Sequence, residues 1–291
     1  MIKTSRQLKD LIRNMSQKKN TEPLILMRNY MMERFLERLT LSEYRNQLIL
    51  KGGMLITAMV GIDTRTTMDM DTTIKGILLD RDTIDHIVSE IILIEIDDGV
   101  SYHIKSISKI MEESDYPGIR VNMEALFDGV KTPLKIDFST GDVIMPHEII
   151  FDFPLLFEER IIPVLAYPLE TVLAEKLETI ISRSITNTRM RDLYDIYILL
   201  RLYSEQLQHE DFFKAFKATI KKRSSILAAQ NAATIIDEIA NDQSQKRLWS
   251  AYQQKFSYAA AVNWSDATAA VRTLINMTSF GTCVSEEQQR G

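Results

Sequence analysis

Asp69 and Asp71 are two aspartates separated by one residue in a strand-like stretch of the sequence. Side chains in a β-strand alternate between two faces, so both carboxylates would point one way and Met68 and Met70 the other. Two carboxylates a few ångströms apart repel each other unless a cation lies between them. The pair therefore predicts a binding site for metal ions.

A glycine pair precedes these aspartates. Lys51-Gly52-Gly53 ends the apolar run Leu48–Leu50 and leads into the helix-like run Met54–Val60. Glycines let the backbone approach a ligand closely, and the start of a helix offers unpaired N–H groups to an anion. Together with the aspartates, this segment predicts a site for a metal–triphosphate complex.

Asp137 adds a third carboxylate. In the segment Pro133–Ser139 apolar side chains alternate with polar ones, which places Asp137 away from the core side of a sheet. Three carboxylates on neighbouring strands could hold two Mg²⁺ ions that keep waters and share phosphate oxygens. An isolated Asp-x-Asp or Gly-Gly is usually a turn or a solvated face, but their order along this chain favours the catalytic interpretation.

A second group of charged residues lies between positions 168 and 202. A helix starting near Pro168 would bury an apolar stripe with Lys176 beside it, and the next helix carries Arg191, Asp192 and Asp195. A lysine near a phosphate site acts as a point charge on a triphosphate. Alternatively, Lys176 could extend its stem over apolar surface and keep its ammonium in water, and Arg191 with Asp195 could form an ordinary i,i+4 ion pair.

The composition is that of a soluble globular protein. The chain has 291 residues, 45% hydrophobic and 26% charged, with a net charge of −5. It has room for one large or two ordinary domains.

An acidic protein needs a local basic patch to bind RNA, and residues 214–223 provide five cations, although a solvated charged face explains them equally well. The single cysteine, Cys283, can form no internal disulfide, no apolar run approaches the roughly 18 residues of a membrane span, and no secretory signal is present, so we expect a cytoplasmic protein without membrane association.

The pattern of elements predicts two halves. Residues 22–39 form an amphipathic helix with Leu24 among its inward residues, and residues 81–95 form another. Strands follow at 101–112 and 119–127, separated by a turn at 115–118. Four prolines indicate an irregular extended connection before a helical remainder: Pro146, Pro154, Pro163 and Pro168. We expect an α+β domain with a mixed sheet over residues 1–165 and an all-α domain over residues 166–291.

These residues together resemble the AbiEii-type toxin family of nucleotidyltransferases over about residues 45–200. The matching positions are Lys51-Gly52-Gly53, Arg65, Thr67 where serine is commoner, Asp69, Asp71, Glu175-Lys176-Leu177, Arg191, Asp192 and Asp195. One departure is that Thr72 and Thr73 follow Asp71, where many members have an apolar residue.

The resemblance implies a polymerase-β-like nucleotidyltransferase core followed by a helical domain. It implies Mg²⁺-dependent transfer of a nucleotide from an NTP to the 3′ end of tRNA. It also implies a bacterial toxin of a toxin–antitoxin or phage-defence pair, with a winged-helix antitoxin as partner, whether or not the two bind directly. Two rival functions stay open: the same chemistry on a small molecule such as an antibiotic, and a non-catalytic binding module on the same fold.

The resemblance also implies roles for single residues. Asp69 and Asp71 would bind both metals, and Asp137 would bind the metal at the attacking hydroxyl. Lys51, Gly52, Gly53, Arg65 and Thr67 would surround the phosphates, with Lys176 neutralising charge, while Asp195 or Asp192 orients Lys176 or contacts the base.

Overall fold

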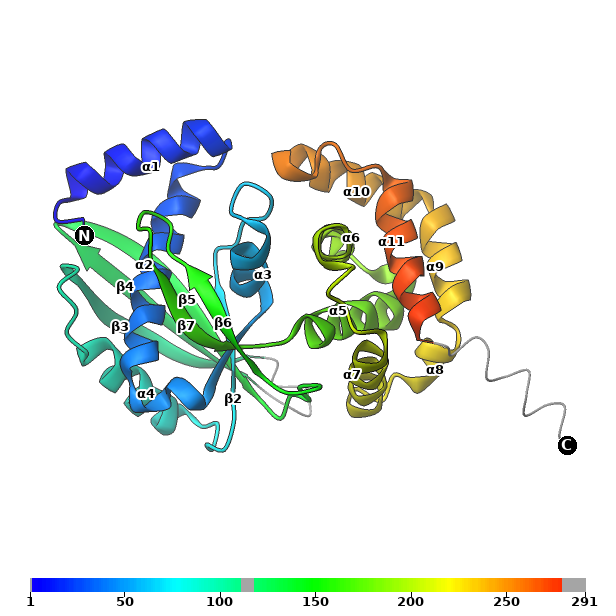
Figure 1. Ribbon diagram of the computed structural model, residues 1–291, viewed down its shortest axis with the longest axis horizontal. Coiled ribbons are helices and arrows are strands. Elements are labelled where there is room, and N and C mark those ends of the chain that lie inside the picture. The colour runs from blue at the N-terminus through cyan, green and yellow to red at the C-terminus, as the bar shows by residue number, and fades with distance from the viewer. Residues whose placement is uncertain (1, 111–117, 279–291) are drawn as a thin grey trace, which may run out of the picture. The chain divides into compact units, whose positions relative to one another are not determined.

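The computed structural model describes residues 2–110 and 118–278, which form two compact units (Figure 1). One unit comprises Met1–Asp142 and Glu148–Tyr167, and the other comprises Val143–His147 and Pro168–Gly291. Cys283 and most of the turn predicted at 115–118 lie outside the described residues.

The first unit is built on a seven-stranded mixed sheet with the strand order β3-β4-β5-β2-β1-β7-β6. The pairs β2/β5 and β1/β7 are parallel, and the other neighbours are antiparallel. The strands are β1 (Leu48–Lys51), β2 (Met70–Ile74), β3 (Val100–Ile110), β4 (Gly118–Phe127), β5 (Val130–Thr140), β6 (Ile149–Pro154) and β7 (Ile161–Ala166).

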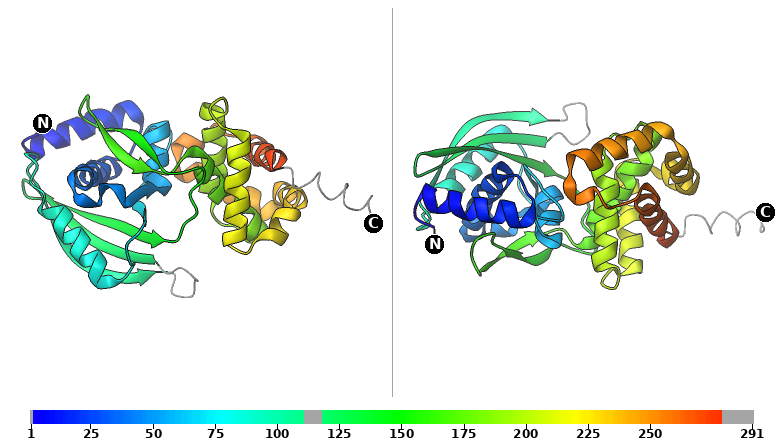
Figure 2. Two further views of the ribbon diagram at one scale, coloured as in Figure 1. Left: turned by 60° about the horizontal axis from the view of Figure 1, so that its bottom comes forward. Right: turned by 90° about the horizontal axis from the view of Figure 1, so that it is seen from above.

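Helices cover the apolar face of this sheet. Helix α2 (Pro23–Leu41) packs against β5 and β7, and α4 (Arg81–Leu93) packs against α2 and β3. The sheet curves around α2, as the two views of Figure 2 show, and α1 (Ser5–Lys19) lies against α2. The predicted alternation in β4 is confirmed, since Ile119, Val121, Met123, Ala125 and Phe127 are all buried.

The hairpin turn between β4 and β5 sets the register of the sheet's central strands. Both turn residues, Asp128 and Gly129, have positive φ angles of 44° and 78°. A two-residue Asp-Gly loop of this kind is a type I′ turn, whose twist matches that of the flanking strands. The turn therefore fixes which residues of β4 and β5 face each other, from Phe127 opposite Val130 to Ile119 opposite Phe138.

Two predictions about side-chain direction are wrong. Leu24, expected to face inward, is 55% exposed because it lies in the first turn of α2, and Met68 is 40% exposed. Met68 and Asp69 lie in a bend, and the strand begins only at Met70. Strand alternation therefore applies to Met70, which is fully buried, and not to the residues before it.

The region with four prolines contains two strands, so the predicted irregular connection is wrong in part. Pro154 is the last residue of β6, and Pro163 lies inside β7 opposite Asp152. Strand β7 pairs with β1 only at Ala166, so Pro163 faces a neighbouring strand on one side alone. Proline is tolerated there because no ladder hydrogen bond from its nitrogen is required.

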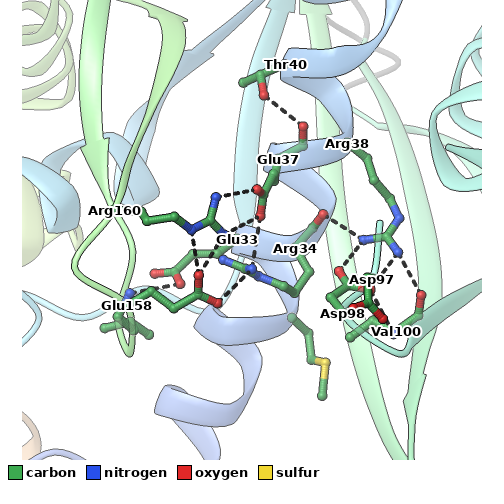
Figure 3. Close-up of polar contacts among 12 residues, drawn as sticks. Glu33, Arg34, Glu37, Arg38, Thr40, Asp97, Asp98, Val100, Glu158 and Arg160 are labelled. Carbon is green, nitrogen blue, oxygen red and sulfur yellow. Dashed lines mark hydrogen bonds and ion pairs between the residues drawn. The ribbon is translucent and has the colours of Figure 1, made fainter. Parts of the chain in front are cut away.

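Helix α2 carries buried charges, whereas the sequence predicted an ordinary amphipathic helix (Figure 3). Arg38 donates to both carboxylate oxygens of Asp98, at 2.6 and 2.9 Å, and to the Val100 carbonyl at 2.8 Å. These bonds fasten the start of β3 to the helix. Arg38 is 3% exposed and Asp98 is fully buried, so the pair satisfies two charges that would otherwise be costly in the core.

The same helix also holds the turn between β6 and β7. Arg34 forms ion pairs with Glu37 at 2.9 Å and Glu158 at 3.3 Å, and Arg160 pairs with the same two carboxylates at 2.8 and 2.7 Å. Glu33 accepts a hydrogen bond from the Leu156 amide at 3.1 Å. Burial raises the pKa of Glu33 to about 8, so its carboxyl is largely protonated at neutral pH.

The second unit is helical over its described residues. Its centre is the contact of α5 with α6 and α7 and of α11 with α6 and α9. The predicted inward residues of the first helix, Val172, Leu173, Leu177 and Ile180, are all buried. The helices are α5 (Leu169–Arg183), α6 (Met190–Tyr203), α7 (His209–Lys222), α8 (Ile226–Gln230), α9 (Ala232–Asn241), α10 (Gln243–Lys255) and α11 (Trp264–Met277).

Candidate active site

Four charged residues form a row across four neighbouring strands of the sheet. The register places Arg120 opposite Asp137, Asp137 opposite Asp71, and Asp71 opposite Lys51. Side chains directly opposite each other lie on the same face and about 5 Å apart. This charge row, Arg120–Asp137–Asp71–Lys51, occupies the face away from α2, with two carboxylates in the middle and a cation at each end.

At one end of the charge row Arg120 holds Asp137 by a two-pronged ion pair. Its Nε donates to Oδ1 at 2.8 Å, and its second terminal nitrogen donates to Oδ2 at 2.7 Å. Both side chains are partly buried, at 35% and 17% exposure. The hydrogen bonds to Asp137 raise the pKa of Arg120, although partial burial opposes this. Planar fork geometry makes this the strongest common form of ion pair.

At the other end Lys51 pairs with Asp142, a residue in the segment after β5. Asp142 also accepts hydrogen bonds from the hydroxyls of Tyr167 at 2.8 Å and Ser139 at 2.9 Å. Burial acts to raise the pKa of Asp142, but the Lys51 ammonium and the hydroxyls of Tyr167 and Thr73 outweigh it and lower the pKa. Asp142 therefore stays ionised and holds Lys51 beside Asp71.

The negative charge of Asp71 is only partly compensated by its neighbours. Burial raises the pKa of Asp71, and the neighbouring carboxylates of Asp137 and Asp69 raise it further. The Lys51 charge and the Gly53 amide, whose nitrogen lies 3.4 Å from Asp71 Oδ2, oppose this only in part. A cation bound here would relieve the repulsion, as predicted from the Asp-x-Asp pattern.

The two glycines make room for the residues of the site. Gly52 has a φ of +64°, a left-handed conformation, and a Cβ at this position would overlap the Asp71 carboxylate. A Cβ at Gly53 would lie 2.5 Å from Thr67 Oγ1 and 2.9 Å from Arg65 Nη1. The glycines begin helix α3 (Gly52–Val60), so the same pair turns the chain and lets Asp71 and Thr67 approach the helix start.

The segment before β2 is tied down by backbone contacts. Arg65 and Thr67 are buried, at 2% and 4% exposure. The Arg65 guanidinium donates a hydrogen bond to the Thr66 carbonyl at 2.6 Å. The Thr67 hydroxyl donates a hydrogen bond to the Asp69 carbonyl at 3.1 Å. From α2, the Asn29 amide donates to the Thr67 carbonyl at 2.9 Å. Thr67 therefore packs beside Gly53 at the start of α3, and Asp69 occupies a half-buried bend one residue before the strand.

The donor set of this site fits a magnesium ion in its chemistry. Carboxylate oxygens are the ligands that Mg²⁺ prefers, and Asp71 lies beside Asp137 with its negative charge incompletely compensated. Over residues 2–110 and 118–278, no three His, Cys, Asp or Glu side chains gather into a metal-binding group. Both oxygens of Asp137 accept hydrogen bonds from Arg120.

The second unit brings together the other three predicted residues. Lys176 from α5 lies 2.8 Å from Asp192 and 2.7 Å from Asp195 of α6, and the three side chains are 13%, 4% and 0% exposed. The ammonium is therefore held by two carboxylates. The Arg191 guanidinium lies over the Phe256 ring at 5.3 Å, and Asp195 pairs with Lys176. Both aspartates orient Lys176, the arrangement that the sequence suggested for one of them.

The predicted basic patch of residues 214–223 is partly neutralised. Lys214 pairs with Glu210 at 2.7 Å, and Arg223 pairs with Glu178 at 2.6 Å and Glu175 at 3.2 Å. Lys217 and Lys221 are exposed on α7, while Phe212 and Phe216 on the same helix are buried. The interpretation as a solvated face gains weight from these ion pairs.

Sequence reasoning missed Arg120 and Asp142. Arg120 lies in an alternating strand, where a polar residue is expected on the open face, and nothing local to it marks a site. Asp142 lies in the segment just after β5. Both join the site through the strand register and the path of the chain after β5, which the sequence pattern leaves open.

Comparisons with known proteins agree with this fold. Residues 34–272 match the family model described as nucleotidyl transferase AbiEii toxin, type IV TA system. No match is found among curated proteins. The crystal structure of a candidate nucleotidyltransferase from H. pylori aligns with 89% of this chain and 96% of its own, with 13% identity and a TM-score of 0.50.

A second solved structure, JHP933 from Helicobacter pylori, covers 93% of this chain and 98% of its own, with 14% identity and a TM-score of 0.47. At such identities these likenesses concern the fold, and the first agrees with the α+β architecture seen here. The family match spans most of the chain. This protein therefore belongs to the AbiEii family of nucleotidyl transferase toxins of type IV toxin–antitoxin systems.

Proposed function

We propose that this nucleotidyltransferase moves a nucleotide from an NTP to an RNA acceptor, the 3′ end of tRNA, in a reaction that requires Mg²⁺. The observation that carries the proposal is the charge row, with Asp71 and Asp137 side by side and the glycine pair packed against Asp71. Carboxylates placed beside the start of a helix suit a metal-bound triphosphate.

In the proposed reaction the hydroxyl oxygen at the RNA 3′ end forms a bond to the α-phosphorus of the NTP. The bond from that phosphorus to the oxygen bridging to the β-phosphate breaks, and pyrophosphate leaves with the electron pair while the hydroxyl proton passes to a base. Such transfers depend chiefly on positioning and charge neutralisation. Magnesium supplies charge neutralisation and lowers the pKa of the attacking hydroxyl.

The residues of the first unit have distinct proposed tasks. Asp69 and Asp71 would hold the metal ions together with Asp137, and bound metal would there neutralise phosphate charge and activate the attacking hydroxyl. The Gly53 amide, which donates to Asp71 from the start of α3, would lie beside the phosphates of a bound nucleotide. Lys51 lies beside Asp71. Arg65 and Thr67 pack against the start of α3 at Gly53.

The residues of the second unit have a supporting task in the proposal. Asp192 and Asp195 hold Lys176 in a fixed, charged state, from which it neutralises the triphosphate. In this proposal residues 1–165 are the catalytic domain and residues 166–291 the helical domain. The type IV toxin–antitoxin family implies an antitoxin as partner and an NTP as substrate. Among residues 2–110 and 118–278, no helix is both long and apolar enough to cross a bilayer; we propose that the enzyme acts in the cytoplasm.

The acceptor is tested by incubating the purified protein with each α-labelled NTP, Mg²⁺ and total bacterial RNA. We expect label in RNA of tRNA size. RNA whose 3′-terminal diol has been oxidised with periodate should take up none, because the attacking hydroxyl is gone. Label that appears only in a small-molecule extract, with RNA unlabelled, would contradict the RNA acceptor and support the antibiotic-type alternative.

A further inference from the structure

The two ends of the charge row differ in how their cations are held. Lys51 is fastened by Asp142, which two hydroxyls also contact and which lies outside the row. Arg120 instead pairs with Asp137, which is a member of the row, and its guanidinium donates hydrogen bonds to both carboxylate oxygens. One end of the row is therefore a fixed cation, and the other is a cation bound directly to a proposed metal ligand.

We propose that Arg120 occupies the cation position at Asp137 and competes with a divalent metal ion for it, so that Asp137 becomes available to metal when Arg120 moves to the anionic substrate. The inference rests on the proposed function. It assigns to Arg120 a positioning role that the family match does not assign.

The geometry supports competition between Arg120 and a metal ion for Asp137, rather than a permanent structural bond between Arg120 and Asp137. A guanidinium that donates to both oxygens of a carboxylate covers the directions from which a metal ion would bind it, and the two cations repel each other. Arg120 is 35% exposed and sits on a flexible stem, so it can leave Asp137 without opening the core. Asp137 itself is backed by the buried strand residues Ile136 and Phe138 and stays in place.

Competition links metal binding to nucleotide binding. A triphosphate offers Arg120 several anionic oxygens, which replace Asp137 as its partner. Once Arg120 has moved, Asp137 and Asp71 lie side by side with their charges uncompensated on that side, which favours a divalent ion. Nucleotide should therefore tighten metal binding, and by linkage metal should tighten nucleotide binding by the same factor.

The test is a titration of the full-length protein with Mn²⁺, with the free ion followed by its electron paramagnetic resonance signal. We expect Arg120→Gln to bind Mn²⁺ about tenfold more tightly than wild type without nucleotide, a coupling of about 1.4 kcal/mol. Arg120→Met, of similar length, should act alike and guards against a folding defect of one variant. Circular dichroism checks that each variant is folded.

Two further variants make the test specific. Lys135→Gln removes a positive charge from an exposed side chain two residues from Asp137 on the same face of β5, without touching Asp137, and should leave Mn²⁺ binding close to wild type. The gain from Arg120→Gln should vanish in the Asp137→Asn background. A non-hydrolysable NTP should tighten Mn²⁺ binding in wild type and add little in Arg120→Gln.

Several results would overturn the inference. If folded Arg120 variants bind Mn²⁺ no more tightly than wild type, Arg120 is a simple support for Asp137. If Lys135→Gln gives the same gain, the effect is one of general charge. Both results leave the proposed function intact provided wild type binds Mn²⁺ and Asp71→Asn does not. If wild type binds none with nucleotide present, the proposed metal site fails and the inference fails with it.

Discussion

At the scale of single residues, the candidate site consists of carboxylates whose charges are only partly balanced by cations on adjacent strands. Asp71 is partly buried, its pKa is raised by desolvation and by the carboxylates of Asp137 and Asp69, and Lys51 lies opposite it. The sequence could predict that Asp71 and Asp137 lie on neighbouring strands, because alternation and motif order are local patterns. It could not identify Arg120 or Asp142, because their roles depend on cross-strand register and on the path of the chain after β5.

The requirement for glycine at position 52 can be measured against a matched position. Gly52 and Gly76 both have left-handed φ angles, +64° and +76°, but a Cβ at Gly52 would overlap Asp71, whereas a Cβ at Gly76 meets nothing within 4 Å. Gly76→Ala should lower the free energy of unfolding by about 1 kcal/mol through backbone strain alone. Gly52→Ala should cost about 1–3 kcal/mol more through the clash and should abolish transfer.

Urea denaturation and a transfer assay on the two alanine variants make this comparison. Equal losses of stability in both variants, with transfer kept in Gly52→Ala, would show that Asp71 does not need the space above Gly52.

At the scale of elements, the sequence predicted the strands better than the central helix. Regular alternation marked β4 and β5, and both are present. Helix α2 was expected to have one polar face in water, but Arg34, Glu37 and Arg38 on that face are buried in ion pairs. A one-dimensional pattern cannot distinguish charges that face water from charges that face partners far along the chain, such as Asp98.

The stability of α2 should depend on pH through Glu33. Its folded pKa of about 8 lies above the ordinary value of 4.5, so its contribution to stability is full at low pH and is lost as the pH rises towards 8. Between these values each pH unit removes about 1.4 kcal/mol from this one group. Glu33→Gln cannot ionise, so its stability advantage over wild type should grow from pH 5 to pH 8.

Thermal unfolding of wild type and Glu33→Gln across this pH range gives the answer, with Glu43→Gln, an exposed change in the same unit, as control. Parallel melting curves for wild type and Glu33→Gln would mean that Glu33 is already ionised in the folded protein.

The contact between α5 and α6 depends on the Lys176 cluster. Lys176→Met leaves the nearly buried carboxylates of Asp192 and Asp195 without their cation, which should cost about 3–5 kcal/mol of folding free energy. The triple variant Lys176→Met, Asp192→Asn, Asp195→Asn removes all three charges and should recover much of this loss. If Lys176 neutralises the substrate, the folded triple variant should still lack transfer activity.

Denaturation of the single and triple variants is the measurement. A Lys176→Met protein as stable as wild type would show that the two aspartates are not held as a buried ion pair. A folded triple variant with full transfer activity would remove Lys176 from the proposed mechanism.

At the scale of the whole molecule, the order of motifs along the chain predicted the class of fold. The α+β architecture with a helical remainder is present, and the family match over residues 34–272 agrees with it. The sequence could not supply the sheet order, because β2 reaches β5 and β1 reaches β7 through long connections. It also could not predict β6 and β7, because the prolines in these strands are more typical of loops than of paired strands.

In the proposed reaction Asp71, in the middle of the charge row, is essential for nucleotide transfer. The most direct measurement is the rate at which Asp71→Asn transfers labelled nucleotide to RNA, beside wild type and Asp85→Asn, which removes an exposed carboxylate on α4. We expect a loss of at least ~10³-fold for Asp71→Asn only, with stability equal to or above wild type because carboxylate repulsion is relieved. A folded Asp71→Asn protein that transfers nucleotide at a rate close to wild type would show that Asp71 is not required for transfer.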